Sequence, residues 1–555
     1  MTKFFSYFTV SKVRDVVLRY PYVLLVVFSL MLLLPGIASV PALDRDEAHF
    51  IQATRQMLQT NNYFQVHFQD ITRFQKPPGI NWLQALSVKA FSNADAKIIW
   101  PYRVPSVLGA LFAILLTYFF ARRFIEDKAA LLGALFLASS LLLVVEAHMA
   151  VIDASLLSAV VLMQGALWVI YQAQMVRSKV HWLWAVLFWF GMAYGIVLKG
   201  VTPLVAVLSI IMLCVWERRV DWLKGLYLFW GVVFCCLVSL AWLLLLNAAE
   251  HSNYLLQMLH RDLLPKLQGG HESHGKPPLF HLLSLPITFW PASLFLAFGS
   301  VYAWRYRQEL SVRFLIAWIL PTWIFFELMP TKLPQYVLPT FPAIALLCAL
   351  GALHRTIYKS RMRLRVLVIL WGIASLGFAC SLFILCYLLT GISGWVEVML
   401  CSGLITSTMA CLYLLWYGYY ARATTLVLVM ALFTFPITFK YLLPTLSPLW
   451  LTERVAEQVY KQHLSDRISD DKPLLTVGFA EPSLVFYFNT KQILYTTSMI
   501  ADMEMQRDSG RLLLIDTRAY DRYFKYNDSL VILSSIAGYN YSNGQMVKLL
   551  LVGSK

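Results

Sequence analysis

The sequence predicts an α-helical polytopic membrane protein of about 13 transmembrane helices with a small C-terminal α/β domain outside the membrane. Three observations predict this fold class. Of the 555 residues, 59% are hydrophobic and 14% are charged, whereas soluble domains have roughly 25% charged residues. The apolar residues come in blocks long enough to span hydrocarbon, which takes about 20 helical residues. After residue 443 the charged residues return and the apolar runs become short.

The predicted spans are distributed over most of the chain. They lie near residues 20–40, 103–120, 129–147, 150–172, 182–198, 201–216, 226–247, 279–303, 314–328, 334–352, 366–390, 396–417 and 423–443. The first follows a basic stretch, but its long apolar core predicts an uncleaved anchor rather than a signal peptide.

The net charge of +16 is explained by topology. With the N-terminus in the cytoplasm, the inner segments hold 21 basic residues, against only Lys199 and Lys332 in the short outer turns. The positive-inside rule predicts this bias, so the basicity does not indicate nucleic-acid binding. The pattern predicts an N-terminus in the cytoplasm and a C-terminus on the outer side of the membrane.

All eight cysteines lie in predicted spans, where they are expected to be packing residues.

Two domains are expected. Residues 1–443 form the transmembrane domain, with long outward loops at 41–100 and 248–278, and residues 444–555 form the periplasmic α/β domain. Within the latter, 451–464 has helical spacing, whereas 474–479, 511–517 and 546–552 have the pattern of strands. Residues 542–545 (Ser-Asn-Gly-Gln) predict a hairpin turn.

The first outward loop opens with Leu-Asp-Arg-Asp-Glu-Ala-His at residues 43–49. Asp44 and Glu47 have the spacing of a capping box at the start of an amphipathic helix. Asp46 is left with two interpretations. It either complements the helix dipole or, beside Arg45 and His49, serves as a general base.

Further basic and acidic residues stand at predicted outer edges. Arg73 and Lys76, stiffened by the two prolines that follow, are candidates for binding a leaving phosphate, or else form a snorkelling interfacial stretch. A lone outward lysine in the turn at 329–339 fits an anionic headgroup. This lysine, Lys332, is a further candidate for binding the donor phosphate. Lower-ranked candidates for lining the site are Glu47, His49, His148, Asp153, His271 and His274. The last two histidines could ligate a metal, but no third or fourth ligand is evident. No cofactor is required, and a need for divalent metal is left open.

These segments resemble a known family. The Asp-Glu pair after the first span, Lys-Pro-Pro-Gly, the Lys-Leu-Pro-Gln-Tyr-Val-Leu-Pro turn and the outward C-terminal domain are similar to bacterial membrane glycosyltransferases that include the aminoarabinose transferases of lipid A. These are relatives of the protein O-mannosyltransferases and share the GT-C fold. Leu-Asp-Arg-Asp-Glu-Ala, Glu-Ala-His-Met-Ala and Glu-Ser-His-Gly-Lys-Pro-Pro resemble a group of uncharacterised alphaproteobacterial members.

The resemblance implies a polyprenyl-phosphate sugar donor, with Asp46 near the sugar and Lys76 near the phosphate. Two positions depart from the aminoarabinose transferases: Gln75 replaces a glutamate, and His49 replaces an arginine.

The expected function is inverting transfer of a hexosyl or pentosyl group from that donor to an envelope acceptor, namely lipid A or lipopolysaccharide, another glycan or a protein. Membrane lipids are the other expected partners. The alternatives are a transporter or flippase for lipid-linked sugars or other anions, which would carry ionisable residues at mid-span, and a structural subunit of an envelope assembly.

Overall fold

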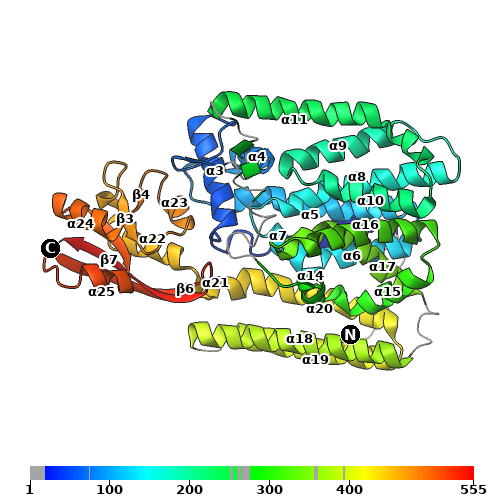
Figure 1. The fold of residues 1–555 in the computed structure, drawn as a ribbon. Helices are drawn as coiled ribbons and strands as arrows, with labels where there is room; N and C mark the ends of the chain where they lie inside the picture. Colours follow the sequence, from blue (N-terminus) through cyan, green and yellow to red (C-terminus); the bar gives the residue numbers. More distant parts are fainter. Residues whose placement is uncertain are drawn as a thin grey trace.

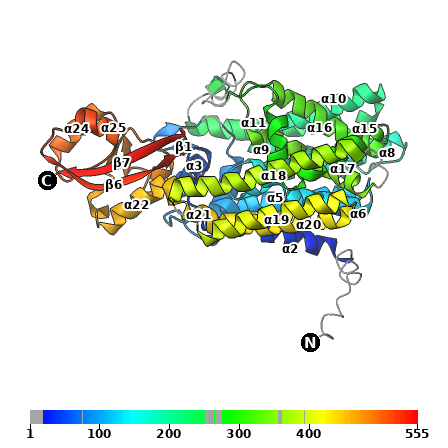
Figure 2. The ribbon, with the colours of Figure 1, turned by 90° about the horizontal axis from the view of Figure 1, so that it is seen from below.

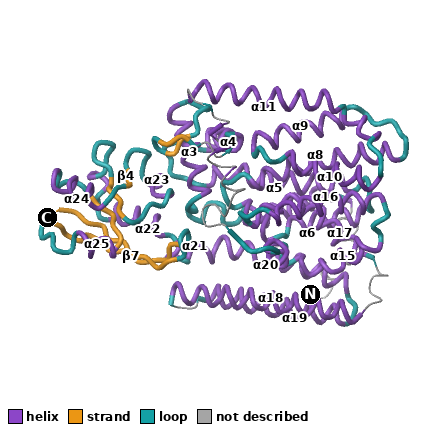
Figure 3. Tube along the Cα trace, viewed as in Figure 1, coloured by secondary structure: helices purple, strands orange, loops and turns teal. Residues whose placement is uncertain are grey.

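The protein consists of a bundle of long helices with a smaller α/β domain at one end of it (Figures 1 and 3). The computed structural model describes residues 19–73, 76–250, 253, 256–257, 259–260, 264, 275–354, 361–391 and 394–554. The bundle is a membrane domain: within the described residues, eight helices are long and apolar enough to cross a membrane. They are α5 (Trp100–Ala121), α8 (Asp153–Met175), α11 (Leu228–Glu250), α16 (Leu310–Leu328), η6 with α17 (Pro334–Thr340 and Phe341–Leu353), α18 (Arg361–Thr390), α19 (Trp395–Trp416) and α20 (Tyr420–Ile437).

Two further predicted spans are bent pairs of helices. One consists of α6 (Asp127–Ala138) and α7 (Leu141–Ala147), bent by 58°, and the other of α14 (Phe280–Thr288) with η5 (Ala292–Phe295) and α15 (Leu296–Arg305), bent by 115°. At the first bend Ser139 and Ser140 donate hydrogen bonds to the preceding carbonyls of Phe136 and Leu137, a pattern that bends helices. At the second, Pro291 lies in the break, where its missing N–H interrupts the helical ladder.

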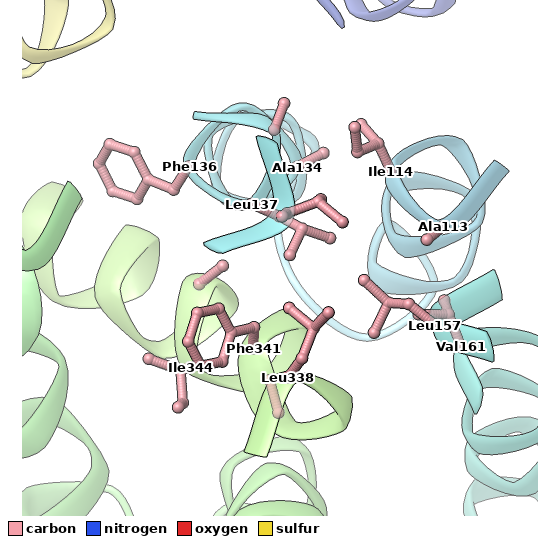
Figure 4. Packing of buried hydrophobic residues seen from close by; sticks show 14 of the residues in the cluster. Ala113, Ile114, Ala134, Phe136, Leu137, Leu157, Val161, Leu338, Phe341 and Ile344 are labelled. Atoms are coloured by element: carbon pink, nitrogen blue, oxygen red, sulfur yellow. The ribbon is translucent and has the colours of Figure 1, made fainter. Parts of the chain in front are cut away.

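Three shorter apolar helices occupy the remaining predicted span positions: α2 (Pro21–Leu33), α9 (Leu183–Leu198) and α10 (Pro203–Glu217). The centre of the bundle is an apolar core in which α5, α6, α8 and α17 meet. Figure 4 shows Ile114, Leu137, Leu157 and Phe341 among the side chains of this core. The α18–α19 hairpin lies at an edge of the bundle (Figures 1 and 2).

The segment between α2 and α5 lies at the end of the bundle that faces the α/β domain (Figure 1). It contains α3 (Asp46–Thr60), a two-stranded antiparallel ribbon of β1 (His67–Phe68) and β2 (Ile71–Thr72), and α4 (Gly79–Phe91). The second predicted outward loop, 248–278, falls mostly outside the described residues.

The C-terminal part is a five-stranded sheet covered by helices on both faces. The strand order is β4 (Ile493–Tyr495), β3 (Leu474–Val477), β5 (Leu512–Asp516), β7 (Gln545–Ser554), β6 (Leu530–Asn540). The strands β4, β3 and β5 are parallel to one another, whereas β7 is antiparallel to both of its neighbours, β5 and β6. One face packs on α22 (Leu451–Lys461) and α23 (Ser483–Tyr487), and the other on α24 (Ser498–Arg507) and α25 (Thr517–Tyr523).

The predicted helix, three strands and hairpin turn of this region are all present, whereas β4 and β6 were not predicted.

Candidate functional site

Asp46 is the first residue of α3 and is exposed at the end of the helical bundle. The residue before it, Arg45, has φ 64° and ψ −110°, a backbone conformation that non-glycine residues rarely adopt. Such strain persists only where the surroundings enforce it, and it is concentrated at functional sites. Contacts with the surrounding structure must therefore hold the chain next to Asp46 in a backbone conformation that Arg45 would not adopt on its own.

The strongest of these contacts is a buried ion pair between Glu47 and Arg103 of α5. Arg103 Nε lies 2.8 Å from Glu47 Oε1 and Nη2 lies 2.9 Å from Oε2, with both side chains at most 1% exposed. The three remaining N–H groups of Arg103 donate to the carbonyls of Ile37, Val40 and Pro41. All five guanidinium donors are thus satisfied, as burial of a charge requires.

The Glu47 carboxylate also accepts two backbone hydrogen bonds. Leu43 N–H donates to Oε2 at 2.8 Å, and Ala150 N–H donates to Oε1 at 2.7 Å. One side chain therefore joins the loop before α3, the span α5 and the turn between α7 and α8. Glu47, buried inside the bundle, therefore fixes these three segments relative to one another.

The predicted capping box is wrong. Arg45, rather than Asp44, is the N-cap of α3, and no side chain caps this helix end. Asp44 instead faces the C-terminal domain: Ser483 donates a hydrogen bond to its carboxylate, and its N–H donates to the Tyr541 hydroxyl at 2.8 Å. Both partners are more than 400 residues away in the sequence, which a local motif cannot reveal.

Burial and the nearby Glu481 carboxylate raise the pKa of Asp44 to about 7. Glu481 is held in place by Asn540, whose Nδ2 donates to its Oε1 at 2.7 Å. Two carboxyl groups therefore face each other across the contact between the membrane domain and the C-terminal domain, and this arrangement keeps a proton on Asp44 at higher pH than an ordinary carboxyl group would.

More bonds fix the C-terminal domain on α3. Arg55, 1% exposed, donates to the Phe486 carbonyl at 3.0 Å and to Asn489 Oδ1 at 2.7 Å. Phe486 itself packs in a small apolar cluster with Ile51 and Tyr102.

A second group of charged residues lies where the turn between α7 and α8 meets the end of α9. Lys199 Nζ is 2.7 Å from Asp153 Oδ1 and 5.2 Å from the centre of the Tyr336 ring. Glu146 is buried beside them, close enough for the charges of Asp153, Lys199 and Asp46 to act on it. Asp46 thus belongs to a mixed acidic and basic cluster at this end of the bundle. Asp153 was among the site residues predicted from the sequence, whereas Lys199 and Tyr336 were not, although Lys199 departed from the positive-inside bias.

The Lys-Pro-Pro-Gly segment lies near the same cluster. A Cβ on Gly79 would approach the Val197 carbonyl oxygen to 2.5 Å, so only glycine allows α4 to pack against the end of α9, two residues before Lys199. The half-buried Lys76 lies three residues before this packed helix begins. The N–H of Arg73 donates to the Val66 carbonyl, and its guanidinium lies 5.9 Å from the centre of the Phe50 ring.

The remaining candidates differ in their surroundings. His49 packs edge-on against Phe68, and burial together with the Arg73 charge lowers its pKa to about 3, so it adds no positive charge beside Asp46. His148 is buried, stacks on Phe439 and has a backbone carbonyl within 2.9 Å of each ring nitrogen, so its contacts are those of a packing residue. Lys332 is 4% exposed and donates to the Met329 carbonyl at 2.6 Å.

His271 and His274 lie outside the described residues, as does Gln75. Within the described part of the chain, no three His, Cys, Asp or Glu residues are grouped closely enough to hold a metal ion.

Comparison with known proteins identifies the fold. Residues 75–244 match the family described as dolichyl-phosphate-mannose-protein mannosyltransferase. The crystal structure of ArnT from Cupriavidus metallidurans superimposes with a TM-score of 0.70 at 16% identity, over 98% of both chains. The chain has the fold of a GT-C membrane glycosyltransferase. An oligosaccharyltransferase from Archaeoglobus fulgidus shares this fold more distantly, with a TM-score of 0.55 at 9% identity over 90% of this chain and 69% of its own.

The sequence relatives confirm the resemblance to the aminoarabinose transferases. Undecaprenyl phosphate-alpha-4-amino-4-deoxy-L-arabinose arabinosyl transferase 1 of Pseudomonas fluorescens is 30% identical over 58% of each chain. The corresponding enzyme of Pseudomonas aeruginosa is 29% identical over 64% of this chain and 63% of its own. The similarity therefore spans about three fifths of these relatives' length.

Replacement of Glu47 by Gln should destabilise the protein by about 3–5 kcal/mol, because it leaves the buried Arg103 charge without its counter-ion. Thermal unfolding of the purified protein in detergent measures this. Glu457→Gln is the matched control, because Glu457 pairs with Lys461 on an exposed helix face and such pairs contribute less than about 1 kcal/mol. Equal unfolding temperatures for the two variants would contradict the role given to Glu47.

The contact between the domains should weaken as the pH rises. A carboxyl group with a raised pKa binds a proton more tightly in the docked state than in the unfolded state. Its contribution is therefore present at low pH and is lost as the pH rises through about 7. Unfolding temperatures from pH 5 to pH 8 should fall with pH for the wild type and fall less for Asp44→Asn, which is neutral throughout. Parallel profiles would show that Asp44 does not titrate in this range.

Proposed function

We propose that this protein is an inverting glycosyltransferase that moves a sugar from a polyprenyl-phosphate donor to an envelope acceptor, namely lipid A or lipopolysaccharide, another glycan or a protein. The observation that carries the proposal is the position of Asp46, an exposed carboxylate at the first residue of α3. It directly follows the strained Arg45, precedes the buried Glu47–Arg103 pair and lies beside a cluster of basic and acidic groups. The relatives named above supply the donor class, since they are undecaprenyl phosphate-dependent arabinosyl transferases, and an ArnT structure with the same fold contains undecaprenyl phosphate.

In the proposed reaction the Asp46 carboxylate accepts the proton of an acceptor hydroxyl. The hydroxyl oxygen then forms a bond to the anomeric carbon while the bond from that carbon to the phosphate oxygen breaks. The electron pair leaves with the phosphate, and Lys76, Arg73 and Lys332 are the cations assigned to that developing charge. Attack opposite the leaving group inverts the anomeric configuration.

The contacts around Asp46 hold the proposed base in a fixed position, which this reaction requires. A general base must stay within hydrogen-bonding distance of the proton that it accepts, and a displacement of about 1 Å can cost about 100-fold in rate. The Glu47–Arg103 pair from the bundle and the Ser483 and Tyr541 contacts from the C-terminal domain hold the residues on both sides of Asp46.

Asp46→Asn tests the base directly. The change keeps the size and much of the hydrogen bonding but removes proton acceptance, so transfer should fall by about 100- to 10,000-fold. The measurement is sugar transfer from a polyprenyl-phosphate donor by purified protein in lipid. Asp70→Asn is the control, because Asp70 is exposed in the same loop segment. A variant at position 46 that keeps more than about a tenth of the wild-type turnover would exclude Asp46 as the base.

Lys76→Ala should weaken use of the donor severely, and Lys76→Arg should retain part of it, because a phosphate requires positive charge but a planar guanidinium fits differently. Donor titrations separate this effect from a loss of folding. Lys89→Ala is the control for general electrostatics, since Lys89 is an exposed lysine on α4 with its Nζ 4.7 Å from the centre of the Tyr63 ring. Equal losses at the two lysines would argue against a phosphate site at Lys76.

We further propose that the protein resides in the bacterial inner membrane, with its N-terminus in the cytoplasm and its C-terminal domain and site in the periplasm. The basic loops at the far end of the bundle support this orientation. A reporter active only in the cytoplasm should be silent when fused after Lys555 and active when fused after Gly418, in the turn between α19 and α20. Activity at both positions would rule out the orientation.

A further inference from the structure

Residues of α6, α17, α18, α19 and α20 line a large cavity. The ends of these helices that border it lie at the end of the bundle opposite the C-terminal domain (Figure 1). The cavity has a volume of about 1090 Å³, which is at the upper end of the range for ligand sites. It is remote from Asp46, because it borders the start of α6 and α20 and the end of α19, where the spans turn back at the far side of the bundle. The proposed glycosyl transfer does not use it.

The mouth of this cavity is positively charged. Lys128 from α6, Arg365 from α18 and Arg422 from α20 line it, and no Asp or Glu is among its described lining residues. Asp127, adjacent to Lys128 in the sequence, is instead 3.5 Å from Arg122. Three cations from three separate helices therefore line one cavity, and none of its described lining residues is a carboxylate that would balance them.

Aromatic rings hold two of these cations. The Arg365 guanidinium lies 4.3 Å from the centre of the Trp416 ring, and that of Arg422 lies 5.0 Å from the centre of the Tyr419 ring. A cation over an aromatic face is oriented while it keeps its full charge and its N–H donors at the ring edge. These arginines are therefore oriented by partners that leave their charge available to an anion.

Another part of the lining is apolar. On α6 it continues from Lys128 through Leu131 to Leu135, which spans about 10 Å along the helix at 1.5 Å per residue. On α18 it continues from Arg365 to Val368. A small inorganic anion would leave this apolar lining uncovered, whereas a molecule with an anionic head and a hydrocarbon tail would cover both parts.

We propose that this cavity binds an anionic phospholipid of the surrounding membrane, with the phosphate of its head group between Lys128, Arg365 and Arg422 and an acyl chain against Leu131 and Leu135. Basic pockets between membrane-spanning helices recognise anionic head groups in this way. The positive-inside rule accounts for cations at this end of the bundle, but it does not require three of them to converge on one cavity. Binding here concerns the membrane environment of the protein and is independent of the sugar donor.

Native mass spectrometry of the purified protein in detergent, after addition of phosphatidylglycerol or phosphatidylethanolamine, tests the proposal. The wild type should retain phosphatidylglycerol in preference to phosphatidylethanolamine. The triple variant Lys128→Ala, Arg365→Ala, Arg422→Ala should retain at least about tenfold less phosphatidylglycerol. The matched control is Arg177→Ala, Lys179→Ala, Arg218→Ala, which removes the same charge from loops at the same end that do not line the cavity. This control should bind as the wild type does.

A single substitution gives a second test that does not depend on correct folding of the triple variant. Lys128→Glu reverses one exposed charge at the mouth and should also lower retention of phosphatidylglycerol. Equal losses in the control variant, equal retention of the two lipids by the wild type, or displacement of the lipid by inorganic phosphate would each overturn the proposal. The measurement can be repeated with Asp46→Asn, so its outcome is separate from that of the transferase assay.

Discussion

The buried ion pair between Glu47 and Arg103 is the constraint on which the candidate site depends. Two charges at most 1% exposed are tolerated only because every donor of the guanidinium has an acceptor. A pair of this kind adds little net stability compared with an apolar contact, but removal of one partner is costly. Its effect is therefore to fix geometry. It ties the loop before α3 and the α7–α8 turn to one residue of α5, and Asp46 is the next residue after the strained position that this bracing enforces.

The C-terminal domain completes the bracing from outside the bundle. Tyr541 lies in the turn of the β6–β7 hairpin and Ser483 begins α23, so two separate elements of that domain meet at Asp44. The proximity of Glu481 makes this contact sensitive to charge, since two ionised carboxylates would repel each other there. The sequence shows the C-terminal domain only as a separate region after the last span. Through these contacts it helps to hold Asp46, the candidate base, in position.

The membrane part of this fold could be predicted from the sequence because apolar segments of spanning length need no knowledge of their neighbours. The motifs around Asp46 and Lys76 could be selected because a known family shares them. The capping box at Asp44 failed for a physical reason: a local spacing rule assumes local partners, and the partners of Asp44 lie in the C-terminal domain. Arg103 was not recognised because it lies inside an apolar span, where only the folded structure shows that it has a counter-ion.

The two ends of the bundle use charge in different ways. At the end that carries Asp46, acidic and basic groups alternate in space: Asp153 pairs with Lys199, and Glu146 is buried beside them. A site that must hold an anionic leaving group and also accept a proton needs both signs of charge close together. At the opposite end, the charged residues among the described lining of the cavity are all cations, and apolar residues line it beside them. That arrangement suits retention of an anionic amphiphile, and no carboxylate among the described lining residues could accept a proton there. The two ends of one bundle are therefore suited to catalysis and to lipid binding respectively.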